Sequence, residues 1–378
     1  MCLRPITIKN PWFCPFPLGS KGRGNFEKKF PLWFLHDTQS VYINVPCGMC
    51  VECRKARQAE FVQRCSLMSR FSWTLFGTLT YSNDAIPIKY VNGRPLKYAD
   101  SRDFQNFIKR LRLERIIPPF RYLAVSEYGS DEKKHHRPHF HFLFFIPKPS
   151  ERISADLDKM QGFEYASSVL HFIQSEHGWS RNYGDRLDPI YMPLSLFIKK
   201  GNKSTFDCQY VSHDTANVNF YVTKYVLKFS KYVQDLQSAL RLNLNEVEYK
   251  DIWSLVRPKL LTSNGLGIKM QGGFPSDHID DQIDMALLDM IKYSEREQKN
   301  PQFYLNGKSQ PLSKYYQNKC LTIEQKLKFH YNKVDTPFDD ETYDREVVLN
   351  DFVLDENKKF VKEENFISLC SRLNAQKY

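Results

Sequence analysis

Short runs of alternating or continuously apolar residues are separated along the chain by segments whose apolar residues recur at helical spacing. The runs at residues 73–82, 121–129 and 139–146 predict strands. Residues 99–115 carry phenylalanine and leucine residues about one turn apart, which predicts an amphipathic helix. A polar, charged loop links the second and third strands, so we expect these two to form an exposed hairpin.

Similar patterns continue on both sides of this hairpin. Residues 54–71, 151–178 and 214–230 are expected to be helical, and residues 191–198 and 205–212 to form strands. This order of strands and helices predicts an α+β fold, in which a mostly antiparallel sheet is covered by helices on one side.

The chain divides into three segments of different character. Residues 1–72 form an N-terminal arm, expected to be irregular because of its Pro and Gly residues, followed by a cysteine-rich element and a helix. Residues 73–232 hold the sheet, and residues 233–378 form a helix-rich C-terminal extension. Within it, residues 339–365 contain ten Asp or Glu against four Lys or Arg, which predicts a solvated tail or a segment that folds back on the basic body.

Charge and cysteine content narrow the class of protein. The formal net charge of +11 favours a polyanionic partner such as nucleic acid, although a basic protein without such a partner is the alternative. No window approaches the roughly 20 apolar residues that cross a bilayer, and the N-terminus lacks the apolar core of a signal peptide, so we expect no membrane association and an intracellular location. The nine cysteines are then expected to be thiols or metal ligands.

Two histidines lie close together in the third strand. Because side chains alternate along a strand, His139 and His141 share one face, which Leu143 continues, while Phe140 and its even-numbered neighbours face the core. Imidazoles about 7 Å apart along a strand can converge on one divalent ion. The alternative is a pair of partly exposed histidines that hydrogen-bond to their neighbours.

An acidic residue near the end of the preceding strand changes this picture. If residues 121–129 pair with residues 139–146, Glu127 falls close to His139 and His141. Two histidines and a carboxylate are a usual ligand set for a catalytic divalent cation. Glu127 could equally be a surface acid at the mouth of the hairpin.

A second group of chemically active residues lies on the helix expected over residues 214–230. Tyr221 and Tyr225, one turn apart, line one edge of its apolar stripe, with Lys224 and Lys228 just beyond. Tyrosine is a poor nucleophile at its ordinary pKa, but nearby cations and a polarised phosphate favour its attack. The alternative is a pair of interface aromatics beside lysines that extend toward solvent. The apolar stripe itself consists of Val218, Val222, Val226 and Phe229.

Three cysteines, Cys47, Cys50 and Cys53, follow one another at a spacing typical of metal ligands, and zinc is the expected metal. An iron–sulfur cluster would fit the spacing too. Cys65 is expected to be a core residue, because a continuous helix places it about 18 Å away. Candidates for the fourth ligand are His36, Cys2 and Cys14.

Three ordered motifs of this chain resemble those of the HUH rolling-circle endonucleases, which are named after two histidines separated by a bulky hydrophobic residue. The motifs are TLTY at residues 78–81, RPHFHFLFF at 137–145 and YVTKYVLK at 221–228. A PCGxCxxC leader at residues 46–53 and the SEYG sequence at residues 126–129 further resemble the replication initiators of gokushovirus-type microviruses, where the first residue of the latter is usually Gly.

The resemblance covers residues 45–230 and implies an HUH endonuclease-type antiparallel sheet with packed helices. It also implies that His139 and His141, with Glu127 as the candidate third ligand, bind Mg²⁺ or Mn²⁺. Tyr225 and Tyr221 would then be nucleophiles that alternate in forming a 5′-phosphotyrosine.

The resemblance further implies that Lys224 neutralises phosphate. The implied protein is a metal-dependent, site-specific nickase that rejoins the released strand and starts rolling-circle replication of a bacteriophage genome. Its partners would be single-stranded DNA, the origin and the host replication machinery in the bacterial cytoplasm. The alternatives are an HUH transposase or relaxase, and a zinc-bearing nucleic-acid-binding protein without catalytic activity.

Overall fold

The protein is described by a computed structural model, and its backbone contacts divide the chain into two compact units. The first unit comprises residues 1–54, 286–304 and 309–378, and the second comprises residues 55–285 and 305–308. The structure describes residues 3, 5–29, 36–48, 50–129, 136–149, 153–184, 189–195, 206–211, 222, 231–268, 285–297, 299–305, 308–322, 324–326 and 329.

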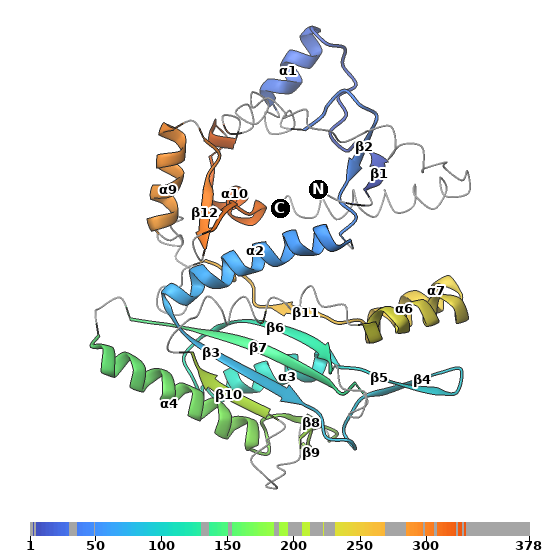
Figure 1. Ribbon diagram of the computed structural model, residues 1–378, viewed down its shortest axis with the longest axis vertical. Helices are drawn as coiled ribbons and strands as arrows, with labels where there is room; N and C mark the ends of the chain where they lie inside the picture. Colours follow the sequence, from blue (N-terminus) through green and yellow to red (C-terminus); the bar gives the residue numbers. More distant parts are fainter. Residues whose placement is uncertain are drawn as a thin grey trace. The chain divides into compact units, whose positions relative to one another are not determined.

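The second unit is built on a five-stranded sheet in which every neighbouring pair of strands is antiparallel (Figure 1). This arrangement confirms the predicted mixed fold with an antiparallel sheet. In spatial order the strands are β10 (Phe206–Tyr210), β3 (Ser72–Thr80), β7 (Pro138–Pro147), β6 (Arg121–Tyr128) and β11 (Leu260–Thr262).

One face of the sheet packs against two helices, α3 (Ser101–Leu113) and α4 (Ala155–Gln174). Phe140, Phe142 and Phe144 of β7 lie in this core, as strand alternation predicts, and none of them is exposed to solvent. The apolar stripe of α3 meets them, since its buried residues recur at helical spacing.

The other face of the sheet is also covered. Helix α2 (Val51–Arg70) contributes Cys65, which packs in a cluster with Leu143, Phe145 and Val222. The prediction that helices cover one side only is therefore wrong. Strands buried on both faces are apolar almost throughout, and the FHFLFFI sequence of β7 has this character. Cys65 is confirmed as a core residue.

Gly77 marks a close approach between β3 and its neighbours. A methyl group at this position would lie 2.2 Å from the ring of Phe142 and 2.6 Å from the carbonyl oxygen of Asp207. We expect Gly77→Ala to lower the free energy of unfolding by about 1–3 kcal/mol, because overpacking forces neighbours apart. Urea titration measures this loss, and Gly24→Ala, whose methyl group meets nothing within 4 Å, is the control. Equal stabilities of Gly77→Ala and wild type would contradict the expectation.

Further elements of the second unit pack at the end of the sheet where β6 ends. Helices α6 (Lys231–Asn243) and α7 (Glu246–Val256) form an apolar cluster with Tyr128. A two-stranded hairpin, β4 (Ile88–Val91) and β5 (Arg94–Lys97), contributes to the same cluster. The short strands β8 (Ser180–Asn182) and β9 (Tyr191–Pro193) form another antiparallel pair.

The N-terminal part of the first unit has regular structure, contrary to the prediction of an irregular arm. Strands β1 (Ile6–Lys9) and β2 (Tyr42–Val45) pair antiparallel, and α1 (Lys21–Lys29) lies between them in the sequence. The side chain of Asn10 donates to the carbonyl oxygens of Asp37 and Ser40, which ties the two ends of this segment together.

The C-terminal part of the first unit includes three kinds of element. These are helix α9 (Met285–Arg296), the strand pair β12 (Gln302–Leu305) and β13 (Lys308–Pro311), and helix α10 (Lys314–Cys320). The acidic segment 339–365 lies outside the described residues. Among the described helices, none is long and apolar enough to span a membrane.

Candidate active site

Three side chains from neighbouring strands meet where β6 ends and β7 begins. The register pairs Glu127 of β6 directly with His139 of β7, which confirms the expected strand pairing. The Oε2 atom of Glu127 lies 3.6 Å from Nε2 of His139 and 3.5 Å from Nε2 of His141, and the two Nε2 atoms are 3.2 Å apart. One carboxylate and two imidazoles thus converge on a single point.

The outer nitrogen of each imidazole is held by the protein. Nδ1 of His139 lies 3.1 Å from the carbonyl oxygen of Arg137, to which it can only donate. Nδ1 of His141 lies 3.0 Å from the hydroxyl of Thr78, its direct partner on β3. These contacts orient both rings with Nε2 toward Glu127.

This arrangement fits a divalent cation. When a neutral imidazole carries its proton on Nδ1, its Nε2 offers a lone pair, so His139 presents an acceptor toward its neighbours. A carboxylate oxygen and ring nitrogens that face one another repel unless a positive charge lies between them. Two histidines and one carboxylate are a common ligand set that leaves positions open for substrate.

The group is shielded but remains accessible. The side chain of Glu127 is 8 % exposed, that of His141 is 11 % exposed and that of His139 is 16 % exposed. The ring of Phe76 stacks on His141 with its centroid 5.9 Å away. Electrostatic interactions are stronger in such a partly dry environment, and the rings have little freedom to turn.

The contact between Thr78 and His141 gives a test of how the ring is held. Removal of a residue that supports a metal ligand generally costs about 10- to 100-fold in metal affinity or activity. We therefore expect Thr78→Val to weaken Mn²⁺ binding by about that factor, measured by isothermal titration calorimetry. Thr74→Val removes a hydroxyl from the same face of β3 and is the control. Unchanged affinity in Thr78→Val would show that the hydroxyl does not support the ligand.

The predicted nucleophiles Tyr221 and Tyr225 and the predicted phosphate-binding Lys224 lie outside the described residues. Val222, next to Tyr221 in sequence, is described: it is helical, fully buried, and packed in the cluster that contains Leu143. Leu143 belongs to the same face of β7 as the two histidines.

Two tyrosines near the group are unsuited to attack a phosphate. Burial, and then the nearby Asp103 carboxylate, raise the pKa of Tyr81 well above its usual value. Burial likewise raises the pKa of Tyr128, whose hydroxyl donates to the carbonyl oxygen of Val256. Both hydroxyls therefore stay protonated and engaged in the fold.

The sequence interpretation missed the buried network around Tyr81. Asp103 accepts from the Tyr81 hydroxyl at 3.0 Å and from the Arg181 guanidinium at 2.6 and 3.0 Å. Asp103 falls within the apolar face of α3, and an acid at such a position is a signal that it has a buried partner. The network fixes Tyr81, one residue beyond the end of β3.

Ser126, which stands where the resembling proteins usually have Gly, has a structural role. Its hydroxyl accepts the backbone N–H of Lys259 at 2.8 Å, and its own N–H donates to the carbonyl oxygen of Lys259 at 2.9 Å. These bonds hold the segment that leads into β11 beside β6.

Residues 74–230 match a family model of replication-associated proteins, the ORF2 family. This range contains Glu127, both histidines and the segment with Tyr221 and Tyr225. The match supports a role in DNA replication and is consistent with a rolling-circle replication initiator. It covers less than half of the chain. No curated protein and no solved structure gave a significant match.

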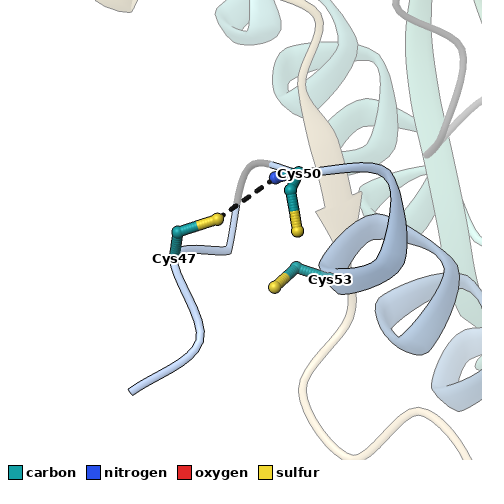
Figure 2. A group of neighbouring side chains, drawn as sticks. All are labelled: Cys47, Cys50 and Cys53. Carbon is teal, nitrogen blue, oxygen red and sulfur yellow. Dashed lines mark hydrogen bonds between the residues drawn. The ribbon is translucent and has the colours of Figure 1, made fainter. Parts of the chain in front are cut away.

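The three cysteines of the predicted zinc site lie together in the first unit. The sulfur atoms of Cys47, Cys50 and Cys53 are within 4.8 Å of one another (Figure 2). Of the candidates for a fourth ligand, Cys14 is buried and His36 stacks on Trp12, and neither joins this group. Cys2 lies outside the described residues.

Proposed function

We propose that this protein is an HUH-type replication initiator, which nicks single-stranded DNA at an origin through a tyrosine and later rejoins the released strand. The observation that carries the proposal is the convergence of Glu127, His139 and His141 within the part of the chain that matches replication-associated proteins. The same resemblance suggests the genome of a small microvirus-type bacteriophage, copied in the cytoplasm of its bacterial host.

The three converging side chains would hold a divalent cation, Mg²⁺ or Mn²⁺. Such a cation polarises a phosphate and helps to orient it. His139 and His141 supply neutral nitrogen ligands and Glu127 supplies one negative charge. Their partners Arg137 and Thr78 keep the rings turned inward before any substrate arrives.

The nucleophile is proposed to be Tyr225, with Tyr221 as its alternate. The Cα atom of Tyr221 is one peptide unit, about 3.8 Å, from that of Val222, which packs in the cluster on the histidine face. This proximity supports placing the helix's phenols near the candidate metal ligands. Lys224, between the two tyrosines, would neutralise phosphate charge.

The proposed reaction conserves the energy of the phosphodiester bond. The phenolic oxygen attacks phosphorus, the bond between phosphorus and the 3′ oxygen breaks, and the 3′ oxygen takes up a proton. The products are a 5′-phosphotyrosine and a 3′-hydroxyl that can prime a host polymerase. The reverse attack by a 3′-hydroxyl releases the tyrosine and closes the strand, so no nucleotide cofactor is needed.

A second tyrosine permits two successive cuts. One phenol remains linked to DNA while the other cleaves the regenerated origin after a full round of synthesis. The net charge of +11 supports DNA binding through phosphate contacts, so we expect affinity to fall steeply as salt rises.

A covalent adduct is the direct test of this function. The full chain is incubated with labelled single-stranded origin DNA and Mn²⁺, denatured, and examined for a labelled protein band that EDTA prevents. Peptide mapping of the band is expected to find the nucleotide on Tyr221 or Tyr225. Binding without an adduct under any divalent metal would favour a non-catalytic nucleic-acid-binding protein and overturn the proposal. Adducts on only one tyrosine, with strand joining unaffected by loss of the other, would favour a relaxase or transposase.

A further inference from the structure

The cysteine triad lies at a junction that brings its three sulfur atoms together through local structure alone. Cys47 follows β2 and Pro46, Gly48 turns the chain with φ +71°, and Cys50 directly precedes α2. Cys53 lies in the first turn of α2, three residues after Cys50 and therefore on the same side of the helix. Figure 2 shows the three sulfur atoms turned toward one another.

The hydrogen bonding and charge around the triad favour thiolates bound to a metal. The backbone N–H of Cys50 donates to the sulfur of Cys47 at 3.3 Å, and such bonds support metal-bound sulfur. The positive end of the α2 dipole faces the group, which favours anionic ligands there. None of the described cysteines takes part in a disulfide.

We propose that Cys47, Cys50 and Cys53 bind one Zn²⁺ ion in a site separate from the Glu127 group. Thiolate sulfur is a preferred ligand of Zn²⁺, and three sulfurs within 4.8 Å of one another match the separation of ligands around a tetrahedral ion with Zn–S bonds of about 2.3 Å. No fourth Cys, His, Asp or Glu among the described residues joins the group, so the described residues provide three of the four ligands.

The ion would fasten the turn between β2 and the start of α2. Its role is structural, because all three ligands come from seven consecutive residues whose positions it would fix. The proposal does not depend on DNA cleavage and stands or falls by itself.

Metal analysis of the full chain tests the site. We expect one zinc per chain after purification without chelators, and its loss in Cys47→Ser, Cys50→Ser and Cys53→Ser. Cys320→Ser is the matched control, because Cys320 is a half-buried thiol of α10 whose pKa burial raises to about 12. The double variant His139→Ala/His141→Ala is expected to keep its zinc, which separates the two sites.

Spectroscopy keeps the test valid if a serine variant folds poorly. Wild-type protein reconstituted with Co²⁺ is expected to show the visible absorption of tetrahedral cobalt and a sulfur-to-cobalt charge-transfer band, both absent from the Cys50→Ser variant. Equal zinc content in wild type and the triple serine variant would overturn the proposal. A Cys47–Cys50 disulfide without metal, or iron with acid-labile sulfide at the triad, would overturn it too.

A second, independent inference concerns the β4–β5 hairpin. Its two-residue turn is Asn92-Gly93, with φ values of +48° and +75°, which are typical of the tight turns that suit the twist of paired strands. Val91 and Leu96 pack against the cluster of α6 and α7, so the hairpin has a firm base. Figure 1 shows it projecting beyond the end of the sheet where β6 terminates.

The outer surface of this hairpin has the composition of a nucleic-acid contact. Tyr90 is 67 % exposed and shares a face with Ile88, which is 43 % exposed. Lys89, Arg94 and Lys97 supply three positive charges, and residues 86–98 contain no acid. Exposed aromatics stack on unpaired bases while cations follow the phosphates.

We infer that this hairpin holds single-stranded DNA next to the Glu127 group, an inference that rests on the proposed function. Tyr98, which follows β5, packs in the same cluster as Tyr128, the residue after Glu127. The base of the hairpin therefore lies at the end of the sheet that carries the candidate metal ligands. Tyr90 would stack on a base, and Arg94 would contact a phosphate.

Binding measured without cleavage tests the inference. Fluorescence anisotropy with labelled single-stranded DNA in EDTA is expected to show about 5- to 100-fold weaker binding for Tyr90→Ala. Arg94→Ala is expected to lower the slope of log affinity against log salt by about 0.7. Tyr293→Ala, an exposed tyrosine of α9, is the matched control.

The outcomes separate this inference from the proposed function. Wild-type binding with equal affinities for Tyr90→Ala and Tyr293→Ala would overturn the role of the hairpin and leave the nickase proposal standing. A wild-type protein that binds no single-stranded DNA would overturn both.

Discussion

Replacement of His141 by alanine is expected to slow DNA cleavage by about 10³-fold or more. A catalytic cation contributes several kcal/mol to charge stabilisation in the transition state, and about 4 kcal/mol corresponds to that factor. His141 lies 3.2 Å from the other imidazole nitrogen and 3.5 Å from the carboxylate, so its loss leaves two of three ligands. The single-turnover rate of adduct formation with Mn²⁺ measures the effect.

The matched control is His171→Ala, because His171 is an exposed histidine of α4 far from the group in sequence. Glu127→Gln provides a second variant of nearly equal shape without the charge, and we expect weaker Mn²⁺ binding from it as well. If His141→Ala bound Mn²⁺ and cleaved DNA as wild type does, the assignment of this group as the catalytic centre would be wrong.

Removal of both proposed nucleophiles is expected to abolish the covalent adduct. Phenylalanine keeps the ring of tyrosine but has no oxygen to attack phosphorus, and loss of a nucleophile commonly costs about 10⁴-fold or more. The double variant Tyr221→Phe/Tyr225→Phe should therefore form no adduct above background while it still binds DNA. Each single variant should still cut, and both should join strands poorly, because the proposed scheme uses the two phenols in turn.

Gel analysis of cleavage and joining, with anisotropy to confirm DNA binding, distinguishes these outcomes. Tyr293→Phe is the control, since Tyr293 is exposed on α9. Persistence of a full adduct in the double variant would show that another residue is the nucleophile. Tyr81 and Tyr128 are poor substitutes, because burial raises the pKa of each.

The parts of the fold that follow from side-chain alternation were predicted correctly from the sequence. Strand β7 has Phe140, Phe142 and Phe144 on one face and the histidines on the other, and its pairing with β6 brings Glu127 opposite His139. A hairpin with a short strand on either side has few registers that keep both apolar rows buried. Metal binding by this group, and the roles of Tyr221, Lys224 and Tyr225, stay predictions.

Other parts were missed for identifiable physical reasons. The β4–β5 hairpin had a usable signal in Asn92-Gly93, which the helix-based interpretation of the surrounding chain passed over. Strand β11 had no such signal, since three residues show no periodicity and their pairing with β6 depends on contacts distant in sequence. Helix α2 was predicted, but its position on the histidine face follows from packing and not from local pattern.

The bonds between Ser126 and Lys259 bear on how this protein can be divided. The segment that matches the replication-associated family ends at residue 230, yet β11 covers the side of β6 farther from β7. A fragment cut after residue 230 would leave β6 as a bare edge strand, and a fragment that begins at residue 74 would uncover the apolar face beneath α2. Both cuts invite intermolecular strand pairing and aggregation, so a minimal nuclease should run from residue 55 at least to residue 268.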